Sequence, residues 1–263
     1  MKRINFKKLT SLIAVSCIVF GLASSSAHAA GDVKAPHDMQ WPHEGVFGTY
    51  DIPAVQRGYQ IYRENCSACH SMKYMSYRNL AEIGFTEDEI KTIAKEYTYI
   101  DGPNDEGDMF ERPGKTSDRF KGPYANEEQA RYANNGALPP DMSLLVKARA
   151  NGEDYIYSIL TGYVEAPEGE DLGAGQHWNE YMLGHKIAMA PPLADGTIVY
   201  SDGTEATLEQ AAMDVVQFLA WASEPTADKR KAMGFKIMAY LLIFSILMYL
   251  AKVKIWHDVK KKK

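Results

Sequence analysis

The feature that most constrains this chain is Cys66-Ser67-Ala68-Cys69-His70, in which two cysteines flank two small residues and a histidine follows at once. The C-x-x-C-H spacing is the attachment signature of a c-type haem: both thiols bond to vinyl groups of the porphyrin and the adjacent histidine ligates the iron. The motif therefore predicts one covalently attached haem c per chain, with Cys66 and Cys69 as thioether donors and His70 as the proximal ligand.

Other sites also use paired cysteines. A structural zinc site needs four ligands, typically with a second close pair of Cys or His, and this sequence offers no second pair. A thioredoxin-like dithiol needs a βαβ surround, whereas the residues before Cys66 show a helical pattern with Val55, Tyr59 and Tyr62 on one face. A plain disulfide in a structural subunit stays open at this stage and would predict no haem.

The N-terminus indicates export. Residues 1–29 combine a basic start, an apolar run from Leu9 to Ala23 and the small-x-small sequence Ala27-His28-Ala29, the pattern of a cleaved secretory signal peptide. An uncleaved anchor helix is the alternative, and the short apolar run argues against it. The third cysteine, Cys17, lies in this segment and would be lost on maturation.

The C-terminus indicates a membrane anchor. Residues Ile237 to Ala251 carry no charge, and flanking lysines that snorkel extend the apolar stretch to the 21 residues 233–253. A buried core helix is the alternative, but no amphipathic stripe is visible. The basic tail 254–263 predicts a cytoplasmic C-terminus, which would place residues 30–230 in the periplasm beside a bacterial inner membrane.

Charge is distributed unevenly. Residues 31–227 contain 15 basic and 32 acidic side chains, a net charge of −17, while both ends are basic. Such an acidic body argues against nucleic-acid binding and favours a cationic partner, although solubility alone accounts for it equally well.

The nature of the second axial position decides between two kinds of haem protein. Electron transfer uses a second protein ligand, whereas binding or activating a small molecule uses an open site. Met189 is favoured because it directly precedes Ala190-Pro191-Pro192, and prolines fix the backbone that would hold a thioether against iron. The competing histidines are His37, His43, His177, His185 and His257.

Four segments in sequence order carry a family resemblance: Cys66–His70, Asn134–Asp141, Gly152–Tyr155 and Met189–Pro192. Together with the C-terminal anchor they resemble cytochrome c1, the haem subunit of the cytochrome bc1 complex (ubiquinol–cytochrome c oxidoreductase), of the bacterial type. The similarity extends from about Val46 to the lysine tail, and the second and fourth segments are far more specific than C-x-x-C-H.

The resemblance implies a mainly α, cytochrome c-like haem domain with long loops, plus one C-terminal transmembrane helix. It implies iron ligation by His70 and Met189. It also implies four further haem contacts: Arg149 and Tyr155 at the propionates, with Asn134 and Pro140 lining the pocket. Some bacterial members carry an extra disulfide, for which this chain has no cysteines left.

The function implied is electron transfer within a respiratory or photosynthetic bc1 complex. The chain would accept an electron from a Rieske iron–sulfur subunit and pass it to a soluble or anchored c-type cytochrome. A cytochrome b subunit would perform the quinol chemistry, so the chain itself is a relay and not catalytic on its own. The alternative is an anchored haem enzyme or gas sensor with an open sixth iron site.

Periodicity predicts several elements. Helices are expected from Thr86 to about Tyr97 and from Thr207 to about Ala222, each begun by a capping-box pattern. Residues 100–126 and 164–182 are expected to be long loops, the first with a solvated acidic stretch rather than a calcium site. A short hairpin is expected at Thr197–Gly203. The second helix has an apolar face suited to pack on the helix before Cys66, namely Ala211, Val215, Phe218, Leu219 and Ala222.

Overall fold

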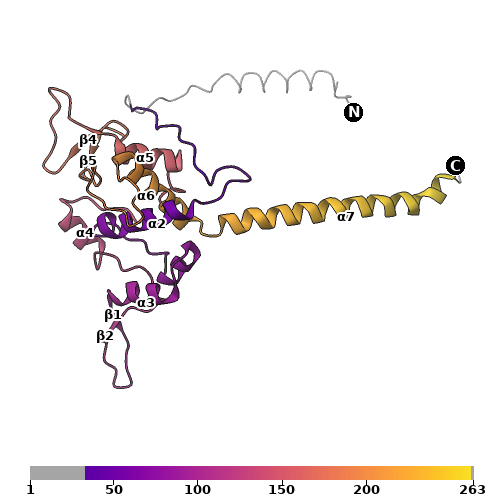
Figure 1. Ribbon diagram of the computed structural model, residues 1–263, viewed down its shortest axis with the longest axis horizontal. Helices are drawn as coiled ribbons and strands as arrows, with labels where there is room; N and C mark the ends of the chain where they lie inside the picture. Colours follow the sequence, from indigo (N-terminus) through magenta and orange to yellow (C-terminus); the bar gives the residue numbers. More distant parts are fainter. Residues whose placement is uncertain (1–32, 262–263) are drawn as a thin grey trace, which may run out of the picture.

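The computed structural model describes residues 33–261. They form a mainly helical domain from which one long helix projects (Figure 1), so the predicted fold class is confirmed. The signal peptide predicted at residues 1–29 lies outside the described residues. The helices are α2 (Ile52–Ile61), a π-helical turn (Tyr62–Cys66), a 3-10 helix (Tyr77–Ile83), α3 (Glu87–Lys95), α4 (Glu127–Ala133), α5 (Gly152–Thr161), α6 (Leu208–Ser223) and α7 (Ala227–Lys261). The strands are β1 (Thr98–Asp101), β2 (Phe110–Pro113), β3 (Tyr163–Val164), β4 (His177–Asn179) and β5 (Lys186–Ile187).

Both predicted helix starts are confirmed. At α3, Thr86 Oγ1 accepts from the Glu89 amide at 3.3 Å and the Glu89 carboxylate accepts from the Thr86 amide at 2.7 Å, which completes a capping box. At α6, Thr207 Oγ1 accepts from the Gln210 amide at 3.1 Å. The Gln210 side chain does not return to the cap but donates to Asp214, 3.0 Å away.

Helices α2 and α6 cross at close range and form the centre of the domain. The predicted apolar face of α6 is buried, and Val55 and Tyr59 of α2 are buried against it. Contact is closest at Gly58, where an added Cβ would lie 2.0 Å from the Asp214 carbonyl oxygen and 2.7 Å from Phe218 Cβ. A glycine is therefore required at this crossing because any side chain would push the two helices apart.

Replacing Gly58 by alanine is expected to destabilise the domain by about 2 kcal/mol in the free energy of unfolding. Overpacking a tight core contact costs roughly 1–3 kcal/mol, and the better helix propensity of alanine returns about 1 kcal/mol of that cost at most. Denaturant unfolding measures the change. Gly122→Ala is the control, because its Cβ would meet Ser71 Cβ at 3.5 Å and the Tyr124 carbonyl oxygen at 4.0 Å, both ordinary contact distances. Equal stability of the two variants would contradict the close crossing.

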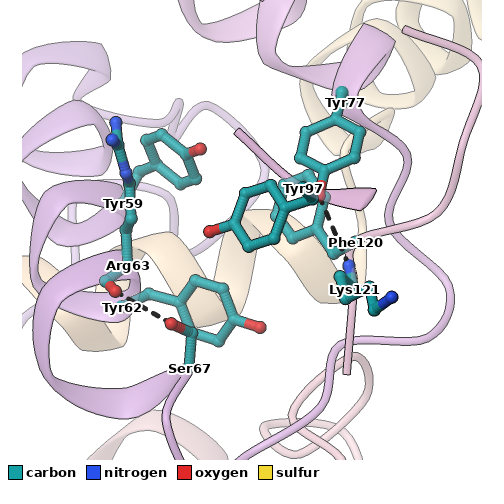
Figure 2. Close-up of a pocket in the computed structure, with 8 residues that line it drawn as sticks. All are labelled: Tyr59, Tyr62, Arg63, Ser67, Tyr77, Tyr97, Phe120 and Lys121. Carbon is teal, nitrogen blue, oxygen red and sulfur yellow. Dashed lines mark hydrogen bonds between the residues drawn. The ribbon is translucent and has the colours of Figure 1, made fainter. Parts of the chain in front are cut away.

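Aromatic rings fill the space behind the cysteine motif. The Tyr62 ring lies beside Phe120 and Phe218, with centroid distances of 6.1 and 5.5 Å. Figure 2 shows rings of this layer around a cavity of about 10 Å³, which Ser67 of the motif also lines. The Ser67 hydroxyl donates to the Arg63 carbonyl at 2.8 Å, and burial raises the pKa of Tyr62 well above its ordinary value. The cysteine motif therefore packs against a layer of aromatic rings in which Tyr62 is uncharged.

Short strands occur where loops were expected. Strands β1 and β2 pair antiparallel, from Thr98↔Pro113 to Asp101↔Phe110, and their hairpin projects from the domain (Figure 1). Strand β4 is the middle of a second sheet, ordered β3-β4-β5. The prediction of long loops over 100–126 and 164–182 is wrong at these strands, because runs of two to four residues are too short to show an alternating pattern.

The hairpin predicted at Thr197–Gly203 is wrong, because this described segment contains no strand. Ile198 and Tyr200 are buried while Val199 is 83% exposed, so the alternation itself is real. The Val199 carbonyl accepts from Gln60 Nε2 of α2 at 3.1 Å. The alternating residues therefore form one extended segment packed on a helix, with no partner strand.

Helix α7 carries the span predicted at 233–253. The stretch Ala227–His257 is long and apolar enough to cross a membrane, with a mean hydropathy of 1.9 over its most apolar window, none of which is buried in the domain. The 35 residues of α7 extend about 52 Å at 1.5 Å per residue, more than a hydrocarbon core of roughly 30 Å requires. Figure 1 shows this helix projecting away from the domain.

Candidate functional site

The cysteine motif begins in the π-helical turn that follows α2. The Cys66 carbonyl accepts from the amides of Cys69 and His70 at 3.1 and 2.9 Å, so the motif closes into a compact loop. Cys66 is buried and Cys69 is exposed, and both are free thiols rather than a disulfide. Burial, and to a smaller extent the neighbouring Cys69, raises the pKa of the Cys66 thiol to about 12. The motif thus presents two sulphurs that are not joined to each other.

The ring of His70 is held in one tautomer. His70 is buried, and its Nδ1 lies 2.8 Å from the Pro140 carbonyl oxygen. Because a carbonyl can only accept, Nδ1 must carry the proton, which leaves the lone pair on Nε2. Burial lowers the pKa of His70, although Pro140 and Asp141 act in the opposite direction. A neutral imidazole with a free Nε2 is the form that ligates a metal.

Asp141 clamps the segment after His70 to the segment of Pro140. Its carboxylate accepts from the Ser71 hydroxyl at 2.7 Å, from the Lys73 amide at 2.9 Å and from the Ser143 amide at 2.9 Å. Burial raises the pKa of Asp141, but the hydrogen bonds from Ser143, Lys73 and Ser71 outweigh it and leave a lowered value. Sequence reasoning missed this residue, although it stands at the end of the Asn134–Asp141 motif.

The Met189 segment lies beside the cysteine motif. It follows β5 directly, and Asn65 Nδ2, next to Cys66, donates to the Pro192 carbonyl at 3.3 Å. Tyr163 of β3 donates its hydroxyl to the Met189 carbonyl at 3.1 Å. Met189 itself is half-buried. The cysteine motif and the Met189 segment, more than 100 residues apart in sequence, are therefore held side by side, as two axial ligands of one iron would require. Sequence reasoning missed Asn65 and Tyr163.

The competing histidines are mostly engaged elsewhere. His37 Nε2 lies 2.8 Å from the Tyr181 hydroxyl, and His43 Nε2 lies 3.0 Å from the Glu153 carboxylate. His185 Nδ1 contacts the Asn179 carbonyl at 3.1 Å, and its ring stacks on Trp178 at 4.8 Å. His177 lies on β4, and His257 belongs to the far part of α7.

Three of the predicted haem contacts form their hydrogen bonds with residues outside the cysteine motif. Arg149 is exposed and its Nη1 donates to the Ala148 carbonyl at 3.3 Å; it lines a cavity next to α7. The Tyr155 hydroxyl lies 3.8 Å from Met182 Sδ. Asn134 Nδ2 donates to the Tyr124 hydroxyl at 3.0 Å and to the Ala130 carbonyl at 2.7 Å. Only Pro140 of the four is brought into contact with His70, so the roles of the other three stay predictions.

Comparison with known proteins decides the family. The model of the Cytochrome C1 family matches residues 41–259, nearly the whole described chain. The chain belongs to the cytochrome c1 family.

Relatives of known name agree with this membership. The chain is 45% identical over 264 residues to "Cytochrome c1-1, heme protein, mitochondrial" of Solanum tuberosum, covering 98% of this chain and 82% of that protein. It is 42% identical over 272 residues to cytochrome c1 of Rhodospirillum rubrum, covering 96% and 100%. It is also 40% identical over 270 residues to "Cytochrome b/c1" of Bradyrhizobium diazoefficiens, covering 94% of this chain and 39% of that protein.

The donor set of this cytochrome c1 family member fits the haem that proteins of the family carry. Two thiols stand free of each other, one buried and one exposed. The imidazole next to them is fixed as the tautomer that can ligate iron, and the segment of a methionine is hydrogen-bonded beside them. These are the side chains that covalent attachment and two-ligand coordination require.

Proposed function

We propose that this chain is the haem-bearing electron carrier of a bc1 complex. Cys66 and Cys69 would hold one haem c covalently, and His70 and Met189 would ligate its iron. The single observation that carries the proposal is the juxtaposition of a tautomer-fixed His70 with the Met189 segment, which the Asn65–Pro192 hydrogen bond links to the motif. When bound, a haem with His and Met ligands supplies a one-electron couple of raised potential.

The protein side chains would orient and tune the haem. The Pro140 carbonyl fixes the His70 ring, and Asp141 holds the two segments that carry these groups together. Arg149 and Tyr155 would contact the propionates, for which the planar guanidinium of arginine is a suitable donor. Asn134 would line the pocket beside Pro140.

The partners follow from the place of such a carrier in quinol oxidation. A Rieske iron–sulfur subunit would donate the electron, a soluble or anchored c-type cytochrome would accept it, and a cytochrome b subunit would carry out the quinol chemistry. The name "Cytochrome b/c1" of the Bradyrhizobium relative supports the pairing with a b-type protein. The chain would not be catalytic on its own.

The location follows from α7. We infer a single-pass protein of a bacterial inner membrane, with residues 1–29 removed as a signal peptide. The haem domain, residues 30–230, would lie in the periplasm, and the tail 254–263 in the cytoplasm. The apolar span within Ala227–His257 and the lysines that follow it support this topology.

Absorption spectra of the full-length membrane-extracted protein test the proposal. Oxidised, reduced and carbon monoxide-treated reduced samples are expected to show a covalently bound, six-coordinate haem whose reduced spectrum carbon monoxide leaves unchanged. Rapid carbon monoxide binding would instead support the second candidate, an anchored haem enzyme or sensor with an open sixth site. Absence of haem from the extracted protein would refute both.

Electron transfer to a basic acceptor cytochrome is expected to slow with salt. The body between residues 31 and 227 has a net charge of −17, which speeds encounter with a cationic partner at low ionic strength. Raising the ionic strength from about 0.01 to about 1 M shortens the screening length from roughly 30 to 3 Å, so we expect roughly a tenfold or greater fall in the bimolecular rate. Stopped-flow mixing measures it, with a small uncharged reductant as control; a flat profile would rule out electrostatic docking.

A further inference from the structure

A cavity of about 350 Å³ lies where the haem domain meets the beginning of α7. Its walls come from the N-terminal loop around His43, from the segment Val146–Glu153, from the end of α6 and from the first turn of α7. It is separate from the cysteine motif, since neither Cys66–His70 nor Met189 lines it. Its size suits a polar headgroup rather than a single ion.

The walls of this cavity are cationic although the domain is acidic. Four cations line it, Lys147, Arg149, Arg230 and Lys231, against two carboxylates. The carboxylate of Glu224 accepts from Lys147 at 2.9 Å and from Arg230 at 2.5 Å. These two hydrogen bonds, the one from Arg230 more than the one from Lys147, lower the pKa of Glu224. The other, Glu153, faces His43. Even with Arg149 assigned to the haem, the three remaining cations Lys147, Arg230 and Lys231 outnumber the two carboxylates, so the net charge facing the cavity is positive.

His43 supplies a buried polar atom without a partner. Its side chain is only 9% exposed, and its Nε2 faces the Glu153 carboxylate, which can only accept. Its Nδ1 is buried with no hydrogen-bond partner, and such an atom costs about 1–3 kcal/mol. Within the cavity, a headgroup hydroxyl could donate to Nδ1 of the neutral ring, and a phosphate could accept from Nδ1 of the protonated ring.

The cavity sits at the level of a bilayer surface. Arg230 precedes Met233, where the predicted span 233–253 begins, by three residues, or about 4.5 Å along the helix. The headgroup layer on each side of a bilayer is roughly 5–8 Å thick. The Lys231 ammonium, one residue on, donates to the carbonyls of His43 and Gly48 at 2.5 and 2.8 Å. The loop 43–48 is thereby tied to the start of α7.

Apolar side chains of the same loop face outward beside the helix. Phe47 is 84% exposed and Val46 is 64% exposed. The Phe47 ring stacks on Phe235 of α7, with centroids 5.1 Å apart and planes at 17°. Exposed aromatic and aliphatic groups next to a membrane helix are suited to contact acyl chains. This neighbourhood selects a lipid over a free phosphate ion as the occupant.

We propose that this cavity binds the headgroup of one anionic phospholipid of the outer leaflet, with its phosphate on the cavity side of the Lys147 and Arg230 cations that Glu224 joins, and its acyl chains along Phe47 and Phe235. The proposal rests on α7 crossing the membrane and involves neither His70 nor Met189, although Arg149 lines the same cavity. The bound lipid would fix the angle between the haem domain and its anchor.

Native mass spectrometry of the full-length haem protein in neutral detergent tests this site. The probes are phosphatidylglycerol, phosphatidylcholine and inorganic phosphate alone. The double variant Lys147→Gln/Arg230→Gln is expected to lose about tenfold to thirtyfold in phosphatidylglycerol affinity, since each cation at an anionic lipid surface contributes on the order of fivefold. Arg149 is left unchanged because it is proposed to meet the haem. The single variant Lys147→Gln alters only a half-exposed side chain and serves if the double variant does not fold.

The matched control is Lys229→Gln/Lys236→Gln, which removes two exposed lysines from the same end of α7 that do not line the cavity. It is expected to keep wild-type affinity. Equal losses of phosphatidylglycerol affinity in the two double variants would show that general surface charge causes the binding, and would overturn the proposed site. Equal binding of the two phospholipids would overturn it too, as would displacement of phosphatidylglycerol by equimolar inorganic phosphate. The haem spectrum, recorded on every sample, reports separately on the proposed function.

Discussion

Replacing Met189 by leucine is expected to convert a haem that does not react with carbon monoxide into one that binds it on mixing. Leucine has no atom that can ligate iron, so the sixth position of the reduced haem would become open. The fold should persist, because exchanging methionine for leucine conserves volume and costs less than about 1.5 kcal/mol. The midpoint potential is expected to fall, since a methionine ligand raises it.

The matched control is Met182→Leu. Met182 is also half-buried and lies close by in sequence, but its sulphur contacts the Tyr155 hydroxyl at 3.8 Å rather than belonging to the segment hydrogen-bonded beside the motif. This variant is expected to remain unreactive towards carbon monoxide. Reaction of the Met182 variant and not of the Met189 variant would transfer the ligand role to Met182. Reaction of the wild type would establish an open site.

Local spacing was enough to predict the parts of the site that lie next to one another in sequence. The C-x-x-C-H motif is complete within five residues, and the apolar face of α6 follows from a 3.6-residue period that all five of its members obey. The contacts that join distant segments could not be predicted. Asn65, Tyr163 and Asp141 are single polar residues, and nothing in their neighbourhood shows that their partners lie about 25 to 130 residues away.

Weak elements were missed for a related reason. Helices α4 and α5 and the 3-10 helix are only seven to ten residues long, so their apolar positions are too few to establish a period. Strand pairs such as Tyr163↔Asn179 depend on tertiary contacts rather than on a hydrophobic run. In contrast, the error at Thr197–Gly203 came from a real alternation, because a single extended segment packed on a helix shows the same pattern as a strand.

Replacing Arg57 by methionine is expected to destabilise the haem domain by about 3–5 kcal/mol. Arg57 Nε and Nη2 donate to the two carboxylate oxygens of Asp214 at 2.8 and 2.9 Å, and the Asp214 side chain is completely buried. The hydrogen bond to Asp214 raises the pKa of Arg57 above its ordinary value. Removing only the cation leaves a buried charge that no longer has its partner, which is the costly outcome.

The matched control is Arg63→Met. Arg63 lies six residues further along the chain and forms an ion pair with Glu96 at 2.7 Å. The side chains of Arg63 and Glu96 are 39% and 42% exposed. An exposed pair contributes about 0–1 kcal/mol, so this variant should stay near wild type in denaturant unfolding. Similar losses in the free energy of unfolding of the two variants would show that removal of any positive charge, and not the burial of the Arg57–Asp214 pair, causes the destabilisation.

The double variant Arg57→Met/Asp214→Leu separates the pair from its surroundings. Replacing both members of a buried ion pair by apolar groups is often neutral, so the double variant is expected to recover most of the loss. Arg57 also contacts Asp202 at 3.0 Å and lies over the Tyr200 ring at 5.6 Å. These two contacts hold the segment before α6 on α2. If the double variant is as unstable as Arg57→Met, the loss of stability comes from these contacts and not from the buried ion pair. Because α2 leads directly into Cys66, the haem content of each variant, read from its absorption, should follow its stability.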